Sequence, residues 1–226
     1  AILDRISHQH ANAYDALVIK GDVLRSKMNL DAAVAAYSQA MGTVKEFSAR
    51  HWAVFFARGA AYERMGKWHE AEQDLQYALK LQPDQPDVLN YLGYTWLTQG
   101  QNLSEAKDMI AKALSIKPND PQIIDSMGWA LYLTGDYSKA TKFLEKAVDL
   151  IPGDATVNDH LGDVYWLQGR KNEARFQWER SLTFTDDETL KESIRKKIQE
   201  GITAPALAGK NPPQVASKKL QDTPSP

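Results

Sequence analysis

Cysteine is absent from this 226-residue chain. Disulfide bonds, thiol nucleophiles and thiolate metal ligands are therefore excluded together, while the cellular compartment is left open. Long apolar runs are also lacking, because the longest one, residues 52–57, is far shorter than the roughly 18 apolar residues of a membrane-spanning helix. The sequence therefore predicts no transmembrane segment.

An excess of either charge is missing as well. Lysine and arginine total 27 against 29 aspartate and glutamate residues, a formal net charge of −2, whereas proteins that bind nucleic acid usually carry a basic stripe. The five histidines are scattered, and we find neither a glycine-rich phosphate loop nor a serine with a placed base. We therefore expect no nucleic-acid partner, no metal, no cofactor and no enzymatic activity.

Glycines recur at a regular distance along the chain. Four of them follow one another at steps of 34, 35 and 34 residues: Gly59, Gly93, Gly128 and Gly162. Each has a second glycine seven positions later, and an alanine follows twelve or thirteen positions after the first: Ala71, Ala106, Ala140 and Ala174. Self-similarity at such a period indicates a repeat architecture.

Prolines mark the boundaries of the repeating units. Five of the ten lie at the junctions, namely Pro83, Pro86, Pro118, Pro121 and Pro152, and the others lie between 205 and 226. Proline is tolerated in the first turn of a helix and disfavoured in its interior. Each unit is therefore predicted to be two helices of about 13 residues joined by a tight glycine turn. We expect Asp120 to cap a helix that begins at Pro121, and Asp136 to cap the helix after Gly135.

The units resemble the tetratricopeptide repeat (TPR) family in the stretches "LNYLGYTW…A…ALSIKP", "IDSMGWAL…A…AVDLIP" and "NDHLGDVYW…A…W…SL". The resemblance implies an all-α fold, a right-handed α-α superhelix (TPR solenoid) of about five helix-turn-helix repeats with a C-terminal capping helix. The predicted repeats are 14–50, 52–85, 86–120, 121–154 and 155–185.

The two ends of the chain differ from the repeats. Residues 1–13 are interpreted as the remnant second helix of a preceding repeat. Residues 187–200 place Leu190, Ile194 and Ile198 at helical spacing in a charged segment, which predicts the capping helix. Residues 201–226 show no periodicity and are predicted to be a disordered tail.

The first helix of each unit can be divided into two faces around its glycine, because each helical residue turns by 100°. One face is predicted to be core, and the opposite face is the one that lines the concave, peptide-binding groove in TPR proteins. The residues assigned to that groove are Phe56, Asp87, Asn90, Tyr94, Asp125, Trp129, Tyr132, Asp159, Asp163 and Trp166. An alternative for Trp129, Tyr132 and Trp166 is packing against a neighbouring repeat.

Acidic and aromatic residues alternate on the predicted groove. Asp159 and Asp163 are four positions apart, a like-charge pair that destabilises a helix by a few tenths of a kcal/mol, and the sequence offers no structural reason for it. Such a groove suits a partner with lysine or arginine through cation–π contacts of about 0.5 to 2 kcal/mol each. Asparagine and aspartate could also hold the backbone amides of an extended peptide. Matching positions in the last three repeats carry no lysine or arginine, so we do not expect a clamp for a C-terminal carboxylate.

A closer resemblance concerns the C-terminal part of long, exported bacterial TPR proteins, including lipid-anchored periplasmic adaptors for C-terminal processing proteases. It is carried by "RGAAYERMGKWHEAEQDLQYALKLQPDQPDVLNYLGYTW" and "NDHLGDVYWLQGRKNEARFQWERSL". It implies a location in the bacterial periplasm or at the outer membrane, anchored through an N-terminal region outside this chain. A periplasmic protease or a cell-wall enzyme would be the partner. A cytoplasmic location is the alternative, and the start at Ala1 rather than methionine is interpreted as processing or excision.

We therefore expect a non-enzymatic scaffold or adaptor that binds an extended or helical segment of a partner protein. That segment would be basic or would carry exposed apolar residues. Two alternatives stay open. Aromatic residues beside carboxylates also suit sugars, which would make the chain a module that binds cell-wall glycan or peptidoglycan. Exposed repeat ends would favour self-assembly.

Overall fold

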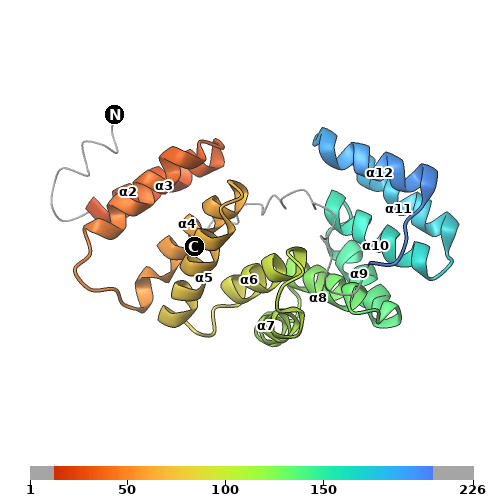
Figure 1. The fold of residues 1–226 in the computed structure, drawn as a ribbon, viewed down its shortest axis with the longest axis horizontal. Coiled ribbons are helices and arrows are strands. Elements are labelled where there is room, and N and C mark those ends of the chain that lie inside the picture. The colour runs from red at the N-terminus through yellow and green to blue at the C-terminus, as the bar shows by residue number, and fades with distance from the viewer. Residues whose placement is uncertain (1–12, 206–226) are drawn as a thin grey trace. The chain divides into compact units, whose positions relative to one another are not determined.

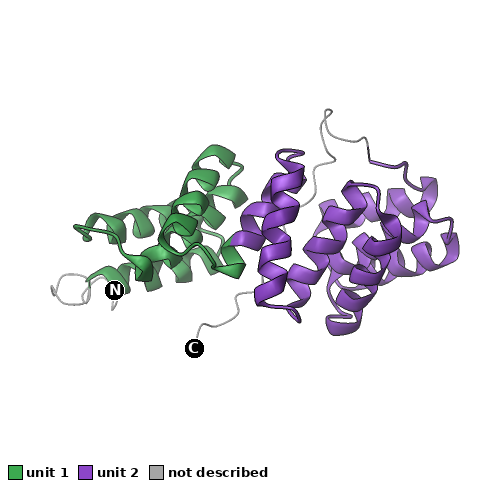
Figure 2. Cartoon of the chain, turned by 90° about the horizontal axis from the view of Figure 1, so that it is seen from below, with its two compact units in different colours: residues 1–88, 219–226 green, residues 89–218 purple. Residues whose placement is uncertain are grey.

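The computed structural model describes residues 13–205, and all regular secondary structure in this part of the chain is helical (Figure 1). It contains eleven α-helices and one short 3₁₀ helix, with no strand between residues 13 and 205. The described residues divide into two compact units, 13–88 and 89–205, which Figure 2 shows in different colours. Each unit is considered by itself below.

The first unit consists of two antiparallel helix pairs. Its helices are α2 (Ala13–Ser26), α3 (Leu30–Gly42), η1 (Ala49–His51), α4 (Trp52–Arg64) and α5 (Trp68–Leu81). Helix α2 packs on α3 and α4 packs on α5, while α3 also contacts α4. The interior is built largely from small residues that let the helices approach closely, and Tyr37 is completely buried among them.

The second unit continues the same pattern and ends in one unpaired helix. Its helices are α6 (Pro86–Thr98), which begins just before the unit, α7 (Leu103–Ile116), α8 (Pro121–Leu133), α9 (Tyr137–Leu150), α10 (Ala155–Leu167), α11 (Lys171–Thr183) and α12 (Glu188–Glu200). Helix α8 pairs with α9 and α10 pairs with α11, while α9 against α10 joins successive pairs. Helix α12 lies against α11.

Helix ends in this unit follow the predicted capping. Asp120 accepts hydrogen bonds from the backbone N–H groups of Gln122 and Ile123, at the start of a helix whose first residue is Pro121. Asp136 likewise accepts a bond from the N–H of Lys139. These bonds satisfy backbone donors that the first turn of a helix leaves unpaired. The predicted caps at Asp120 and Asp136 are therefore confirmed.

The two glycines of a repeat have different physical roles. Gly162 lies where α10 crosses α11, and a Cβ atom there would collide with the indole ring of Trp178. Gly169 has a φ of +82° and nothing within 4 Å of a Cβ atom. The first glycine permits close helix packing, and the second ends the helix in a left-handed conformation. The 34-residue spacing of the glycines therefore reflects two requirements, the close packing of paired helices and the turn between them.

The all-α fold with a C-terminal capping helix agrees with the sequence prediction. Residues 1–12 and 206–226, which hold most of the predicted repeat remnant and tail, lie outside the described residues. The division into five repeats stays a prediction. Between residues 13 and 205, no helix combines the length and apolar character needed to cross a membrane.

Candidate protein-binding face

Helices α8 and α10 present the predicted groove positions of the last two repeats. In α8 the side chains are Asp125, Trp129 and Tyr132, and in α10 they are Asp159, Asp163 and Trp166. Asn90 and Tyr94 belong to α6 in the same unit and are half-buried. Phe56 and Asp87 belong to the first unit, and they are also half-buried.

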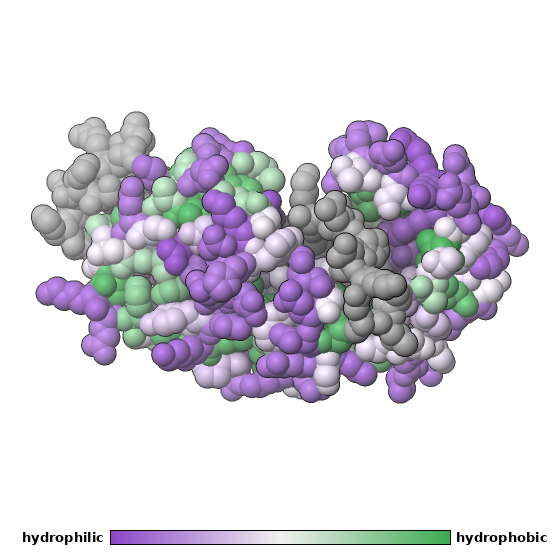
Figure 3. All heavy atoms as spheres, in the orientation of Figure 1, coloured by the Kyte–Doolittle hydropathy of each residue, from purple (hydrophilic) through white to green (hydrophobic). Residues whose placement is uncertain are grey.

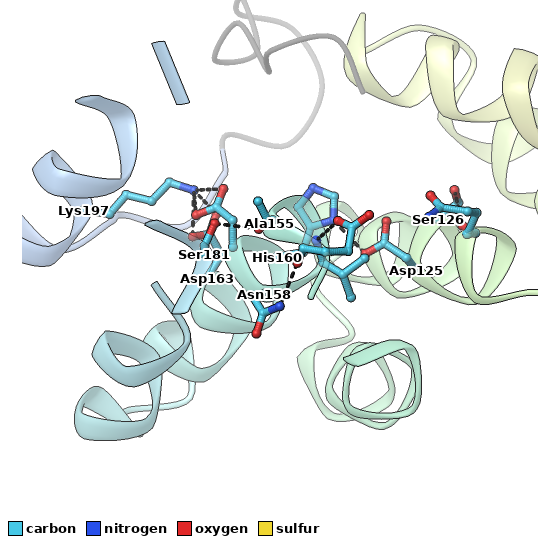
Figure 4. A network of polar contacts seen from close by, with 12 residues as sticks. Asp125, Ser126, Ala155, Asn158, His160, Asp163, Ser181 and Lys197 are labelled. Atoms are coloured by element: carbon cyan, nitrogen blue, oxygen red, sulfur yellow. Dashed lines mark hydrogen bonds and ion pairs between the residues drawn. The ribbon is translucent and has the colours of Figure 1, made fainter. Parts of the chain in front are cut away.

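A buried aspartate–histidine pair joins α8 to α10. The Nδ1 atom of His160 lies 2.9 Å from Oδ1 of Asp125, and neither side chain is more than 2% exposed (Figure 4). The His160 ring also stacks on Trp129, with 4.0 Å between ring centres and 16° between planes. Trp129 stacks in addition on Tyr132 at 4.6 Å. One histidine from the following repeat thus contacts both the acidic and the aromatic groove positions of α8.

The predicted exposure of these α8 side chains is wrong. Asp125 is completely buried, and Trp129 and Tyr132 are 6% and 4% exposed. Burial accordingly raises the pKa of Tyr132 above its ordinary value, and the nearby Asp163 carboxylate adds to that effect. The physical reason is His160, which stacks on the face that helical periodicity alone leaves open. For Trp129 and Tyr132 the structure matches the alternative of packing against a neighbour.

The acidic pair of α10 binds a lysine from α12. The Nζ atom of Lys197 lies 2.7 and 2.8 Å from the two carboxylate oxygens of Asp159, and 2.9 and 3.0 Å from those of Asp163. Figure 4 shows the Lys197 side chain reaching Asp163. Asp159 and Asp163 are 7% and 4% exposed, so the prediction that both lie on a free face is wrong. Lys197 is the structural reason for the like-charge pair, which sequence analysis did not find.

Electrostatics at this pair reflect burial and mutual attraction. Burial raises the pKa of Asp163 to about 6, against the opposing effect of the Lys197 ammonium. Burial also works against the charged form of Lys197, but the carboxylates of Asp159 and Asp163 outweigh it and hold the pKa of Lys197 above its ordinary value. The lysine is therefore charged throughout the physiological pH range.

Asp163 is held from a second side by its own repeat. The indole Nε1 of Trp178 in α11 donates a hydrogen bond of 2.9 Å to Oδ1 of Asp163, and Trp178 is completely buried. Trp166 lies beside it, with 5.3 Å between the two ring centres. The Lys171 ammonium lies 3.6 Å from the centre of the Trp166 ring. Trp166 remains half-buried, and a cation of the same chain already occupies one of its faces.

Two buried polar atoms of the groove positions have no hydrogen-bond partner. They are the Nε1 atom of Trp129, a donor, and the Oδ1 atom of Asn90, an acceptor. Native proteins rarely leave such groups unpaired, because an unsatisfied buried donor or acceptor destabilises by about 1 to 3 kcal/mol.

Residues 13–205 contain no group of three or more His, Asp or Glu side chains able to hold a metal ion.

Three residues of this face were not selected from the sequence: His160, Trp178 and Lys197. His160 stands two positions before Gly162, at the edge of the predicted groove, so its position pointed to it. Lys197 follows Ile194 by three positions and therefore shares its helical face. A lysine on the apolar side of a capping helix is the signal that could have found it.

Two family models match the central part of the chain, at residues 56–121 and 122–154, and both are described as tetratricopeptide repeat. Residues 56–154 of the chain therefore consist of tetratricopeptide repeats. A relative of this TPR chain is the "TPR repeat-containing protein PA4667" of Pseudomonas aeruginosa, which is 35% identical over 91 residues. That match covers 40% of the chain and only 15% of the relative's length.

Solved TPR structures share the fold at lower sequence identity. A thermophilic TPR protein of Thermus thermophilus, TTC0263, has a TM-score of 0.67 and 17% identity, covering 82% of this chain and 99% of its own. A TPR protein of Parabacteroides merdae has a TM-score of 0.69 and 19% identity, covering 86% and 74%. YrrB, described as a TPR protein with an unusual peptide-binding site, has a TM-score of 0.60 and 17% identity, covering 87% and 98%. TPR proteins are generally non-enzymatic scaffolds for protein–protein interaction.

Proposed function

We propose that this TPR chain is a non-enzymatic adaptor that binds an extended or helical segment of a partner protein on the groove positions of α6 and α8. The observation that carries the proposal is the unpaired, buried Nε1 donor of Trp129. A ligand that displaces the residues covering Nε1 and supplies an acceptor there would replace an unsatisfied group with a hydrogen bond, which favours binding.

The backbone of an extended peptide has the required chemistry. Each residue offers one C=O acceptor and, except for proline, one N–H donor. The C=O suits Nε1 of Trp129, and the N–H suits Oδ1 of Asn90 in the preceding repeat. YrrB, whose description includes a peptide-binding site, supports the same class of ligand. Recognition through backbone groups would leave the choice of partner to the surrounding side chains.

The structure changes the expectation that the partner is basic, because the acidic groove residues already have partners within the chain. Asp125 is bonded to His160, and the Asp159–Asp163 pair is bonded to Lys197. A partner lysine or arginine therefore reaches the acidic pair only if it replaces Lys197. Stacking of His160 on Trp129 also covers part of the ring that the glycan alternative requires as a platform.

The proposed setting is the bacterial periplasm or the outer membrane, with a periplasmic protease or a cell-wall enzyme as partner and the cytoplasm as alternative. Its support is the resemblance to exported bacterial TPR proteins, together with the bacterial relative in Pseudomonas aeruginosa. Immunodetection of the native protein in separated cytoplasmic, periplasmic and membrane fractions tests this setting. Recovery in the cytoplasmic fraction alone would refute it.

The binding proposal is tested with a peptide-display library selected against the whole chain. The best selected peptide is then titrated calorimetrically into wild type, Trp129→Phe and Phe176→Ala. Phenylalanine keeps an aromatic ring for stacking but removes the Nε1 donor, so we expect at least tenfold weaker binding. Phe176 is 56% exposed on α11 and serves as the control.

Two results would contradict the proposal. If the library enriches no peptide, the chain lacks a groove for extended segments. If Trp129→Phe binds as tightly as Phe176→Ala, a groove exists but its ligand does not use the Trp129 donor. Circular dichroism of each variant before titration establishes that both are folded.

A further inference from the structure

Helix α12 is attached through few apolar contacts. Ile194 is its one fully buried residue, whereas α9 buries five: Ala140, Thr141, Leu144, Ala147 and Val148. The rest of α12 is largely charged, and on the face shown in Figure 3 the α12 end of the molecule is mostly hydrophilic. A helix with so little buried apolar surface depends heavily on its polar anchor. That anchor is Lys197.

The site that receives Lys197 is built without α12. Asp159 and Asp163 are one turn apart on α10, and the Nε1 group of Trp178 in α11 orients Asp163. Helices α10 and α11 are paired along their lengths, and Trp178 fills the space at Gly162. The Asp163 carboxylate therefore keeps its place if α12 moves away, and Asp159 stays one helical turn from it on α10.

The geometry suits an ammonium group. All four carboxylate oxygens lie between 2.7 and 3.0 Å from Nζ of Lys197. A compact ammonium can be surrounded in this way, whereas a planar guanidinium presents its donors as a fork that pairs with one carboxylate at a time. The pair therefore favours lysine over arginine.

We propose that the Asp159–Asp163 pair is a binding site for a lysine on a helix of a partner protein, and that α12 is its internal competitor. The partner helix would carry an apolar residue three positions before the lysine, as Ile194 precedes Lys197. This inference deepens the proposed function and rests on it for the claim that the ligand is a protein. It adds a second contact region, on α10, whose availability is controlled by α12.

The probe is a fluorescent peptide with the sequence of residues 186–202, "DDETLKESIRKKIQEGI", titrated against the complete chain. In wild type, the resident α12 competes with the peptide. In a Lys197→Gln chain, the anchor of the resident helix is lost and the site is accessible. We expect the peptide to bind the Lys197→Gln chain at least tenfold more tightly than wild type, measured by fluorescence anisotropy.

Matched controls isolate the lysine. A peptide that carries Lys197→Gln should bind the Lys197→Gln chain at least tenfold more weakly than the unaltered peptide. A Lys196→Gln chain should behave like wild type, because Lys196 is 73% exposed. An Ile194→Ala chain loosens α12 without changing the charges, and it should also bind the peptide more tightly than wild type.

Equal affinity of the lysine and glutamine peptides would overturn the proposal, and so would equal affinity of the wild-type and Lys197→Gln chains. A Lys197→Gln, Trp129→Phe chain separates this inference from the proposed function. It should keep the α12 peptide and lose the library-selected peptide. If this double variant fails to bind the α12 peptide, the lysine site is refuted. If it still binds the selected peptide, the role of Trp129 is refuted.

Discussion

The ammonium of Lys197 lies 2.9 Å from Oδ1 of Asp163, although the two residues are 34 positions apart in the chain. This ion pair joins the last unpaired helix to the first helix of the last repeat. Two like charges on α10 repel one another, and the Lys197 ammonium compensates both of them within a buried network of ion pairs. Removal of either side leaves charge buried without a counterion, which is far more destabilising than removal of an exposed pair.

Lys197→Met should release α12. Methionine keeps the length of the side chain but leaves two buried carboxylates uncompensated, a change that typically destabilises by about 3 to 5 kcal/mol. Amide hydrogens of residues 188–200 should then exchange at least about 100-fold faster, because local opening becomes less costly. Hydrogen exchange followed by mass spectrometry measures this. Lys196→Met, at the exposed neighbouring position, should change exchange very little, and a similar effect of both variants would refute the anchor role.

The stability of the chain should depend on the ionisation of Asp163. Its pKa is raised from 3.8 to about 6, mainly by burial. A raised pKa means that folding favours the protonated form, so this contribution is present below about pH 4 and is lost as the pH rises through about 6. The free energy of unfolding of wild type, minus that of Asp163→Asn, should therefore fall between pH 4 and pH 6.5. Urea denaturation at several pH values tests this, and a constant difference would show that Asp163 titrates normally.

Substitutions of the two glycines of the last repeat should act through different causes. In Gly162→Ala, the new Cβ collides with the Trp178 indole, and overpacking of this kind destabilises by about 1 to 3 kcal/mol. It should also displace Trp178 from Asp163, which would alter the near-ultraviolet circular dichroism. Gly169→Ala meets no atom and carries only the strain of a left-handed residue, about 1 kcal/mol. An unchanged near-ultraviolet spectrum in Gly162→Ala would contradict the packing described.

His160→Phe should weaken the contact between α8 and α10. Phenylalanine can still stack on Trp129, but it removes the 2.9 Å hydrogen bond to the buried Asp125. The expected loss is about 1 to 3 kcal/mol in the free energy of unfolding, measured by urea denaturation. His69→Phe is the control, since His69 is exposed on α5. A loss no greater than that of the control would show that the pair contributes nothing to stability.

The helical pairs could be predicted from the sequence because glycine and proline act locally. The backbone or a neighbour within the same repeat requires Gly162, Gly169 and Pro121. Their spacing therefore predicts the helix pairs. The surroundings of Trp129 and Asp163 could not be predicted in this way. Helical periodicity assigns a residue to a face, but what covers that face comes from other helices, here from His160 and Lys197. Lys197 lies outside the repeats, so the repeat spacing does not predict which helix it contacts.

Hydrogen bonding between Trp129 and a bound peptide is observed most directly when the indole N–H signals of the chain are followed by ¹H–¹⁵N NMR while the library-selected peptide is added. The chain has six tryptophans, and Trp178 is an internal reference because its Nε1 already donates to Asp163. We predict that the Trp129 signal moves downfield and exchanges more slowly with solvent as the peptide saturates the groove, while the Trp178 signal stays in place. Saturation by the peptide with an unchanged Trp129 signal would show that the Nε1 group of Trp129 does not bind the peptide.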